Sequence, residues 1–501
     1  MRISAIIPLK AGGVALLLAA SAANGQSAPP VTKGLRDTII NVDSGTIAPA
    51  VLAKEAEQAA NADAAATPKE AETPAKTAEP DVDAVLTGAV PNEPPATSRV
   101  LPEPVIDTSN PPDFIAGNAL RRTLDEDPYA PLGIRAGSFV IFPEVGFGAG
   151  YTSNSTDAPG GTGAALGAIA PQVLIQSDWS RHEATLFLRG SQEAYSDGAD
   201  NVPEAEATGT VRLDLSDRWA ADFRSSYRYG RDQLSDPDLP GGVDKAPDRY
   251  HFNNSATFSK TEGPGVFSLG VNADRETYGE AKSGDKGYDQ RDRDNTLYGA
   301  TLRTGYEISE AFVPYVEAQI SNRVYDKKKD VNGIRRSGHG DGLLVGFAFD
   351  RGPVSSGEIA VGYLRNTFDD NALKPISAFA VDGNLTWSPG YLSTITADIA
   401  TSIDPTTRRN SSGSVVYDGR LEYAYAWRAN VDLGANAAAR YRRYQGVDQV
   451  DWTYQLGFDA TWKINRYSEI AAGYLHEWRD STKRSDDYTS DTIRIDLRVY
   501  R

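Results

Sequence analysis

The sequence predicts an all-β protein, a transmembrane antiparallel up-and-down β-barrel of about 18 strands, within a range of about 16 to 18. Two observations predict this fold. From Phe139 onward, apolar and polar side chains alternate residue by residue, and short turns alternate with longer polar loops between the alternating stretches. No segment contains about 18 consecutive apolar residues, so a membrane-spanning helix is excluded.

The first residues, 1–25, have the pattern of a secretory signal peptide. Arg2 and Lys10 flank the apolar stretch Val14 to Ala20, and small residues follow it at positions 20–25. This stretch is too short to span a bilayer as a helix. We therefore expect export through a cleaved signal peptide, and, together with the strand pattern, a location in the outer membrane of a Gram-negative cell.

Residues 26–110 are rich in Ala, Pro, Glu, Thr and Asp, and acidic side chains outnumber basic ones there by more than two to one. Large apolar residues are too few to offset the entropy lost on ordering, so the sequence predicts a disordered acidic periplasmic leader. An Ala/Glu-rich helix around 50–78 is the alternative. Residues 111–137 are expected to lead into the barrel or to form a partial plug.

Residues 138–501 are expected to form the barrel itself. In one clear strand, Val211, Leu213 and Leu215 share one face, while Arg212 and Asp214 lie on the other. Stretches of about 10 residues match a tilted crossing of a bilayer. The predicted strands are centred near residues 146, 172, 188, 211, 225, 255, 271, 301, 319, 346, 362, 382, 397, 420, 436, 456, 473 and 496.

All seven tryptophans lie near the ends of predicted strands. The indole ring prefers the boundary between membrane and water, because its body is apolar and its one donor needs water. This placement favours aromatic girdles. A soluble β-sandwich is the competing fold, since alternation alone also describes its strands. The many charges on the second face of consecutive strands favour a wet lumen, and a spanning sheet must close because unpaired backbone groups find no water in hydrocarbon.

Composition and motifs give no sign of catalysis or of a cofactor. The formal charge of −17 disfavours nucleic acid as a partner, and the absence of cysteine excludes thiolate metal sites and a lipoprotein anchor. None of the four histidines has metal-ligand spacing with another, and no nucleophile elbow, P-loop or zinc-protease motif occurs. We expect that the chain is not an enzyme and binds no cofactor. His251 near Ser255 leaves a barrel hydrolase as a remote alternative.

Two sets of residues are candidates for function. Charges expected to line the lumen would set ion selectivity electrostatically: Arg212, Asp214, Asp222, Arg224, Arg228, Arg303, Asp459 and Arg494. A basic cluster in an expected outer loop would bind phosphates of lipopolysaccharide or an acidic polysaccharide: Lys327, Lys328, Lys329, Arg335 and Arg336. A solvated hydrophilic loop tip is the alternative for the second set.

The stretch DPYAPLGIRAGSF at 127–139, continuing to Phe142-Pro143-Glu144 and Gly150-Tyr151-Thr152, resembles the start of the putative β-barrel porin 2 family of outer-membrane proteins. The resemblance covers residues 110–501 and leaves out the acidic leader. It implies an outer-membrane barrel and, in relatives, a role beside surface polysaccharide export. Outer-membrane barrels commonly end in an outward-facing aromatic residue that the insertion machinery recognises, and this chain departs from that pattern. Tyr500 is penultimate and falls on the polar face, so either a bulge or an atypical insertion signal is expected.

A barrel of this size is wide enough for an aqueous channel unless something fills it. The sequence therefore predicts a porin-like channel for small solutes or export. The alternative is a non-conducting anchor or scaffold, associated with surface polysaccharide secretion or with periplasmic partners of residues 26–110. Outer-membrane lipid, lipopolysaccharide and the barrel-insertion machinery are the expected partners, and the oligomeric state is left open.

Overall fold

The structure is a computed structural model that describes residues 128–501, apart from 200–201, 217, 237, 241 and 310. The predicted signal peptide, the leader and residues 111–127 lie outside the described residues. Within the described residues, no helix is long and apolar enough to cross a membrane.

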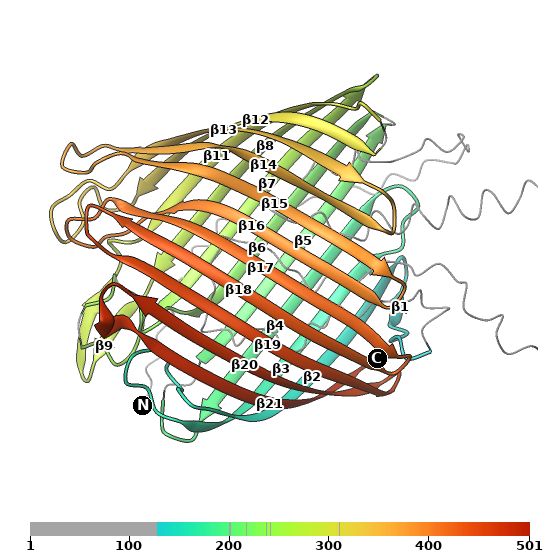
Figure 1. Cartoon of the computed structure of the whole chain (residues 1–501), viewed down its shortest axis with the longest axis horizontal. Helices are drawn as coiled ribbons and strands as arrows, with labels where there is room; N and C mark the ends of the chain where they lie inside the picture. Colours follow the sequence, from blue (N-terminus) through green and yellow to red (C-terminus); the bar gives the residue numbers. More distant parts are fainter. Residues whose placement is uncertain (1–127, 200–201, 217, 237, 241, 310) are drawn as a thin grey trace, which may run out of the picture. The chain divides into compact units, whose positions relative to one another are not determined.

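Eighteen long antiparallel strands form one closed sheet, with each strand paired to its neighbour in the chain (Figure 1). The first seven are β2 (Phe139–Thr152), β3 (Ala164–Ser177), β4 (Glu183–Tyr195), β5 (Val202–Ser216), β6 (Trp219–Arg231), β7 (Asp248–Glu262) and β8 (Gly265–Tyr278). The other eleven are β11 (Asn295–Tyr306), β12 (Phe312–Tyr325), β13 (Gly338–Asp350), β14 (Ser355–Phe368), β15 (Ile376–Gly390), β16 (Ser393–Asp404), β17 (Gly413–Arg428), β18 (Val431–Gln445), β19 (Val450–Asn465), β20 (Ser468–Ser481) and β21 (Tyr488–Tyr500).

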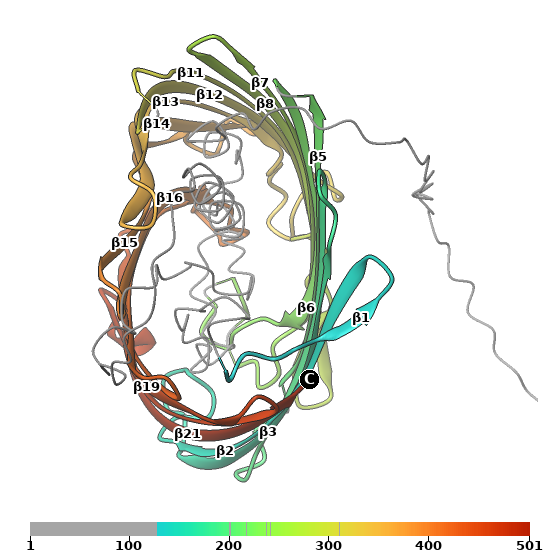
Figure 2. The same cartoon turned by 90° about the vertical axis from the view of Figure 1, so that its right-hand side faces the viewer.

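The barrel closes where the last strand pairs with the first, from Glu144 opposite Tyr500 to Thr152 opposite Thr492. Figure 2, which looks along the barrel, shows the strands as a continuous wall around a lumen. Closure removes the free edge that a sheet in hydrocarbon cannot leave unpaired. Three short strands lie outside the wall: β1 (Ile134–Ala136) pairs with the start of β2, and β9 (Glu280–Ser283) and β10 (Lys286–Asp289) form a hairpin in a loop.

The predicted strands are confirmed, because each of the 18 predicted centres falls inside a long strand. The alternation of connections is confirmed too. Two-residue links such as 391–392 and 429–430 lie at one end of the barrel, and links such as 232–247 and 326–337 lie at the other. In outer-membrane barrels the longer loops face the cell exterior, so we call this end, which carries β9 in Figure 1, the outer end.

The two faces of the wall differ as the alternation predicts. On β11, Tyr298, Leu302 and Tyr306 are 54 to 59% exposed, whereas Arg303 between them is 5% exposed. The exposed apolar side chains point away from the lumen, and the intervening polar ones point into it. An apolar outer face is what a barrel needs when its solvent is lipid.

Aromatic side chains gather at both ends of this outer face. Trp219, Trp387, Trp427 and Trp462 lie near the short turns and are 42 to 52% exposed. Toward the outer end, Trp452 stacks on Tyr454, with ring centroids 5.5 Å apart, and Tyr454 stacks on Trp478 at 5.0 Å. This is the arrangement expected of girdles at two membrane boundaries.

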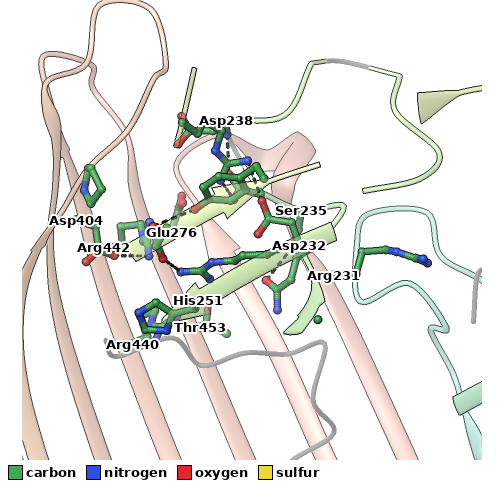
Figure 3. Close-up of a pocket in the computed structure, with 18 of the residues that line it drawn as sticks. Arg231, Asp232, Ser235, Asp238, His251, Glu276, Asp404, Arg440, Arg442 and Thr453 are labelled. Carbon is green, nitrogen blue, oxygen red and sulfur yellow. Dashed lines mark hydrogen bonds and ion pairs between the residues drawn. The ribbon is translucent and has the colours of Figure 1, made fainter. Parts of the chain in front are cut away.

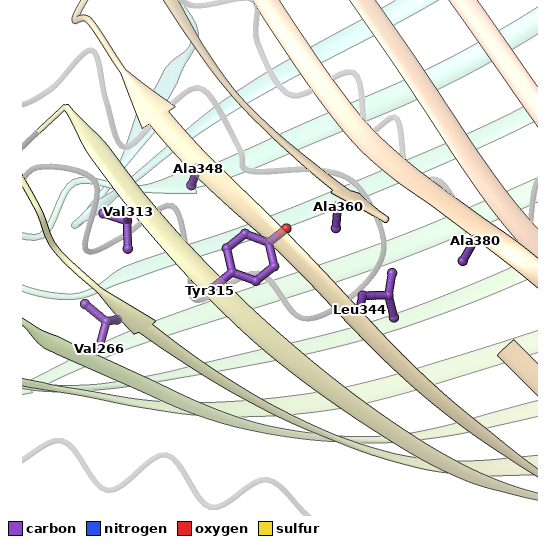
Figure 4. Packing of buried hydrophobic residues seen from close by; sticks show 7 residues of the cluster. All are labelled: Val266, Val313, Tyr315, Leu344, Ala348, Ala360 and Ala380. Carbon is purple, nitrogen blue, oxygen red and sulfur yellow. The ribbon is translucent and has the colours of Figure 1, made fainter. Parts of the chain in front are cut away.

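The inner face is not uniformly polar, contrary to the simplest interpretation of the alternation. A cluster of apolar residues on the inner faces of β8 and β12–β15 is at most 5% exposed (Figure 4): Val266, Val313, Tyr315, Leu344, Ala348, Ala360 and Ala380. Its members alternate with exposed residues such as Leu343 and Val345. Both faces of this part of the wall are therefore apolar.

The C-terminal strand runs without interruption. Its pairing with β2 and with β20 has no register shift, so the bulge that the sequence allowed is absent. Tyr500 stays on the inner face, as its register predicts, and its hydroxyl donates to Glu469 Oε2 at 3.4 Å. The last outward-facing residue of β21 is Val499, which is 46% exposed.

The lead-in segment is described only over residues 128–137. Arg466, in the turn between β19 and β20, donates to the carbonyl of Pro128 at 3.3 Å. All three residues of β1 are exposed. This part of the segment therefore lies along the short-turn rim of the barrel.

The assignment of faces predicts unequal effects for two adjacent substitutions on β11. Leu302→Arg places a charge on the outer face, where an Arg near the bilayer midplane costs roughly 2–4 kcal/mol. Thr301→Arg places the same charge on the inner face and is expected to cost much less. Denaturant unfolding of the two variants in lipid vesicles measures the difference, and equal losses of stability would refute the assignment.

Candidate functional site: a polar constriction in the outer lumen

The loop that joins β6 to β7, residues 232–247, crosses the lumen; we call it the crossing loop. Arg479 on β20 donates to the carbonyl of Ser235 at 3.2 Å. Around the wall, β20 is separated from β6 by β21, β2, β3, β4 and β5. A contact between such distant parts of the wall requires the loop to pass through the interior.

Ion pairs and hydrogen bonds fix the crossing loop at several points. Arg293, just before β11, bonds to Asp232 at 2.8 Å and to Asp236 at 3.0 Å. Asp238 accepts the hydroxyl of Thr406 and, at 3.0 Å, the backbone N–H of Arg408. These last two residues belong to the loop 405–412 between β16 and β17, so two outer loops are joined inside the barrel.

A third loop, 326–337 between β12 and β13, joins the same cluster. The guanidinium of Arg336 is 2% exposed and pairs with Asp330 at 2.8 Å. It also donates to the carbonyls of Ser411 at 2.5 Å and Arg408 at 3.0 Å. A charged guanidinium with several acceptors is a strong brace because each hydrogen bond is charge-assisted. The outer end of the lumen is therefore narrowed by three loops that hold one another.

The crossing loop and the wall line a partly open polar cavity of about 170 Å³, which we call the constriction cavity (Figure 3). Seven arginines line it: Arg228, Arg231, Arg249, Arg293, Arg440, Arg442 and Arg479. Six carboxylates also line it: Asp232, Asp236, Asp238, Glu276, Asp404 and Asp451. A smaller cavity of about 30 Å³ lies against the inner faces of β12–β14, and Asp404 and Pro405 line both cavities.

Comparison with protein families identifies the barrel. The family model described as putative beta-barrel porin 2 matches residues 127–501. The chain belongs to this family. The resemblance seen in the sequence is thereby confirmed, and this porin 2 barrel is an outer-membrane-type β-barrel protein.

No curated protein matches the chain in sequence. Similar solved structures include the siderophore receptor PirA from Pseudomonas aeruginosa, with 8% identity, a TM-score of 0.35 and coverage of 72% of this chain and 80% of that one. The copper transporter OprC has 10% identity, a TM-score of 0.41 and coverage of 74% and 81%. The siderophore receptor PiuA from Acinetobacter baumannii has 10% identity, a TM-score of 0.39 and coverage of 74% and 82%. Structural similarity at this level does not indicate a function for this chain.

The eight charges predicted to line the lumen are all buried or half-buried, and three of them, Arg303, Asp459 and Arg494, each follow a strongly exposed apolar residue of the outer face. Several are held in ion pairs. Arg212 lies 3.2 Å from Asp214 and 3.6 Å from Asp222, and Arg494 lies 2.8 Å from Glu193 and 2.7 Å from Asp496. Of the eight, only Arg228 lines the constriction cavity, so the predicted set describes the wall of the lumen rather than its narrowest part.

Of the five basic residues predicted to bind anions, four are exposed and one is buried. Lys327, Lys328, Lys329 and Arg335 are exposed on the loop 326–337, and Lys327 pairs with Asp289 at 3.1 Å. Arg336 is buried in the loop cluster and braces it. The exposed four are the members that an external anion could reach.

The sequence interpretation missed most of the constriction cavity. Arg440, Arg442 and Tyr444 follow one another at every second position of β18, so alternation alone places them on one face. The inward course of the crossing loop has no such signal, because its contacts join residues far apart in the chain. Within the described part of the chain, no group of three or more His, Asp or Glu side chains is arranged to hold a metal ion.

The carboxyls of the crossing loop do not titrate alike. Burial and the neighbouring Asp236 raise the pKa of Asp232 to about 7, against the opposing effect of Arg293 and Arg249. Burial also raises the pKa of Asp238, with Asp236 adding to the effect. For Asp236, burial is the largest single effect and acts upward, but Arg293, the backbone N–H of Asp238 and other neighbours together hold the pKa below its usual value. With a pKa of about 7, Asp232 exchanges a proton near neutral pH.

These shifts predict that the crossing loop releases more easily as the pH rises. Asp232 binds its proton more tightly in the buried loop than in water, so the closed loop is stabilised at low pH and this stabilisation is lost as the pH rises through about 7. Single-channel conductance is expected to increase, or to flicker more, from about pH 6 to about pH 8. Asp232→Asn, which mimics the protonated form, should remove this dependence. A wild-type conductance that is flat or falls over that range would contradict the prediction.

Proposed function

We propose that this barrel is a porin-like channel that passes small polar solutes across the outer membrane through a constriction at its outer end. The observation that carries the proposal is the crossing loop, braced between Arg293 and Arg479, which leaves a polar cavity of about 170 Å³ in the lumen. A narrow passage lined by both signs of charge limits solutes by size and charge.

The test is conduction by the purified, full-length protein in planar lipid bilayers. We expect discrete single-channel steps of low conductance, because the loops restrict the lumen. Heat-modifiable electrophoretic migration confirms in parallel that the barrel is folded. A folded barrel that stays silent over a wide range of voltage, pH and salt would overturn the channel.

A second candidate is a non-conducting anchor or scaffold beside surface polysaccharide secretion. The observation in its favour is the mutual bracing of the crossing loop with loops 326–337 and 405–412. Deleting residues 26–110 discriminates the two. If the barrel is silent both with and without residues 26–110, and the deletion abolishes capture of a periplasmic partner, the scaffold is supported. If both forms are silent and capture is retained, the partner binds the barrel.

We further propose that the exposed cations of loop 326–337 bind lipopolysaccharide phosphates. Lys327, Lys328, Lys329 and Arg335 are available for such a contact, whereas Arg336 is already used by the loop cluster. Replacing the three lysines with glutamine should weaken binding of lipopolysaccharide micelles without changing conductance. Unchanged binding would contradict this proposal and would mean that these residues form only a solvated loop tip.

A further inference from the structure

Two residues that line the constriction cavity each carry a buried polar atom with no hydrogen-bond partner among the described residues: Tyr444 Oη and Arg479 Nε. Tyr444 is 3% exposed, and the side chain of Arg479 is 9% exposed. Leaving a buried donor unpaired costs free energy, and such groups in native proteins call for an explanation. A bound solute that accepts a hydrogen bond from each of these two atoms is one such explanation.

The charge around these two atoms indicates the kind of solute. Arg442 lies on the same face of β18 as Tyr444 and carries a guanidinium with five N–H donors, of which Asp404 accepts one at 2.8 Å. Arginines outnumber carboxylates in the lining, and Asp232 is partly protonated near neutral pH. The cavity therefore has a surplus of donors and of positive charge.

The volume limits the size of the solute. A cavity of about 170 Å³ is smaller than the roughly 300–1,000 Å³ pockets that hold drug-sized ligands. It fits a small organic acid or an inorganic oxyanion.

We propose that the constriction cavity binds a small oxyanion, a carboxylate or a phosphate, which accepts hydrogen bonds from Tyr444 Oη and Arg479 Nε beside the guanidinium of Arg442. This inference rests on the proposed channel, in which the site would select the solutes that pass. Charge-assisted hydrogen bonds to an oxyanion are stronger than those to a neutral group, so neutral solutes of the same size bind more weakly.

Thermal unfolding of the full-length protein in detergent tests binding without any need for conduction. Inorganic phosphate and citrate are titrated against chloride at equal ionic strength, because a ligand that binds only the folded state raises the melting temperature as its concentration rises. Tyr444→Phe removes only the hydroxyl, and we expect about tenfold weaker binding. Arg479→Lys keeps a charge beside Asp451 but lacks Nε, and it should weaken binding similarly. Tyr298→Phe, on the outer face, is the matched control.

The outcomes separate the site from the channel. A rise in melting temperature with phosphate or citrate, lost in Tyr444→Phe and kept in Tyr298→Phe, supports the site even if the barrel is electrically silent. Stabilisation by one anion alone identifies which class binds. If neither anion stabilises the wild type more than chloride does, or if Tyr444→Phe responds as the wild type does, the site is wrong even where the barrel conducts.

A separate feature of the wall carries a second inference. Strands β15 and β16 pair only between Gly383–Ile399 and Gly390–Ser393. The outer parts of both strands, Ile376–Asp382 and Ala400–Asp404, have no ladder between them, although β15 stays paired with β14 and β16 with β17. A break of this length in a barrel wall is costly in a membrane, because backbone groups lose their partners.

Side chains replace part of the missing ladder. Thr401 Oγ1 accepts the N–H of Val381 and donates to its carbonyl, both at 2.9 Å, and Asp382 Oδ1 accepts the N–H of Thr401 at 2.8 Å. Further out, Tyr417 on β17 donates to the carbonyl of Phe379 on β15 at 2.8 Å, bypassing β16. The seam is therefore closed by a few side-chain contacts.

The outer end of β16 lies inside the lumen instead. Ile403, Asp404 and Pro405 line the smaller cavity together with inward-facing residues of β12–β14, and Asp404 pairs with Arg442. Asp404 and Pro405 thus stand between the two cavities. If this end returned to the wall, the two cavities would join.

We infer that the outer end of β16, residues 400–404, is a gate that moves between the lumen and the gap beside β15. In the lumen it separates the two cavities and holds the loop 405–412 against the crossing loop. In the wall it would extend its existing register with β15, which places Ile403 opposite Phe379, and it would leave a wider passage.

Cysteine pairs test the gate cleanly because the chain has no cysteine of its own. Phe379→Cys with Ile403→Cys reports the return of β16 to the wall, because residues 379 and 403 are not paired in the structure and a disulfide needs their Cα atoms within about 7 Å. Leu385→Cys with Ala397→Cys is the control, because these two residues are paired in the intact ladder and lie on the same face of their strands as residues 379 and 403. Oxidation in bilayers should raise conductance in the first pair, reversibly with reductant, and leave the control unchanged.

Two results would overturn the gate. One is a first pair that never crosslinks while the control pair does, in a barrel that is folded by heat-modifiable migration. The other is a first pair that crosslinks with unchanged conductance. Either result would make the seam a static feature of the wall, and neither depends on anion binding.

Discussion

Removing the crossing loop is expected to raise the conductance of the barrel several-fold. The loop contributes Asp232, Asp236 and Asp238 to the constriction cavity and spans the lumen as far as Arg479. Its two ends are adjacent, because Asp232 donates its backbone N–H to the carbonyl of Pro247 at 2.9 Å. Residues 233–246 can therefore be replaced by an Asn-Gly hairpin turn without stretching β6 or β7.

A deletion elsewhere on the outer end provides the control. Residues 483–485 lie in the loop between β20 and β21 and are exposed. Their removal shortens an outer loop without touching the crossing loop, so conductance should stay at the wild-type level. If both deletions leave conductance unchanged in folded barrels, the crossing loop does not limit the passage, and the narrow point lies elsewhere in the lumen.

The fold was predictable because two solvents act on alternate side chains. On β11, Leu302 meets lipid while Arg303 meets the lumen, and this contrast repeats around the wall except at the apolar inner cluster of β8 and β12–β15. The shortest strands escaped prediction for the same reason. β9 and β10, with sequences EAKS and KGYD, lie in a loop where neither face meets lipid, so their sequences carry no two-faced pattern.

The constriction was less predictable than the wall. Arg442 and Tyr444 could be placed on the inner face from their spacing, but their role depends on what lies across the lumen. Asp236 reaches Arg293 over a separation of 57 residues, and Ser235 reaches Arg479 over 244. No local pattern encodes such contacts. The break between β15 and β16 has no local signal in β15 either, since burial still alternates from Ile376 to Ala380, as it would in an intact ladder.

Replacing Arg303 should destabilise the barrel strongly. Arg303 on β11 lies 2.6 Å from Glu317 on β12 and 2.9 Å from Glu358 on β14, and the three side chains are 6 to 13% exposed. Its guanidinium also lies 4.2 Å from the centre of the Tyr315 ring. Arg303→Gln leaves two buried carboxylates beside each other with no cation, and breaking a buried ion pair in this way costs roughly 3–5 kcal/mol.

Two further variants show whether buried charge is the cause. Arg303→Gln combined with Glu317→Gln removes one carboxylate as well and should recover part of the loss, because fewer buried charges then remain unpaired. Arg218→Gln breaks an exposed pair with Glu262, whose side chains are 64% and 52% exposed, and should cost only about 0–1 kcal/mol. Denaturant unfolding in lipid vesicles measures all three. Equal losses for Arg303→Gln and Arg218→Gln would mean that water reaches the buried trio and screens it as it screens the surface pair.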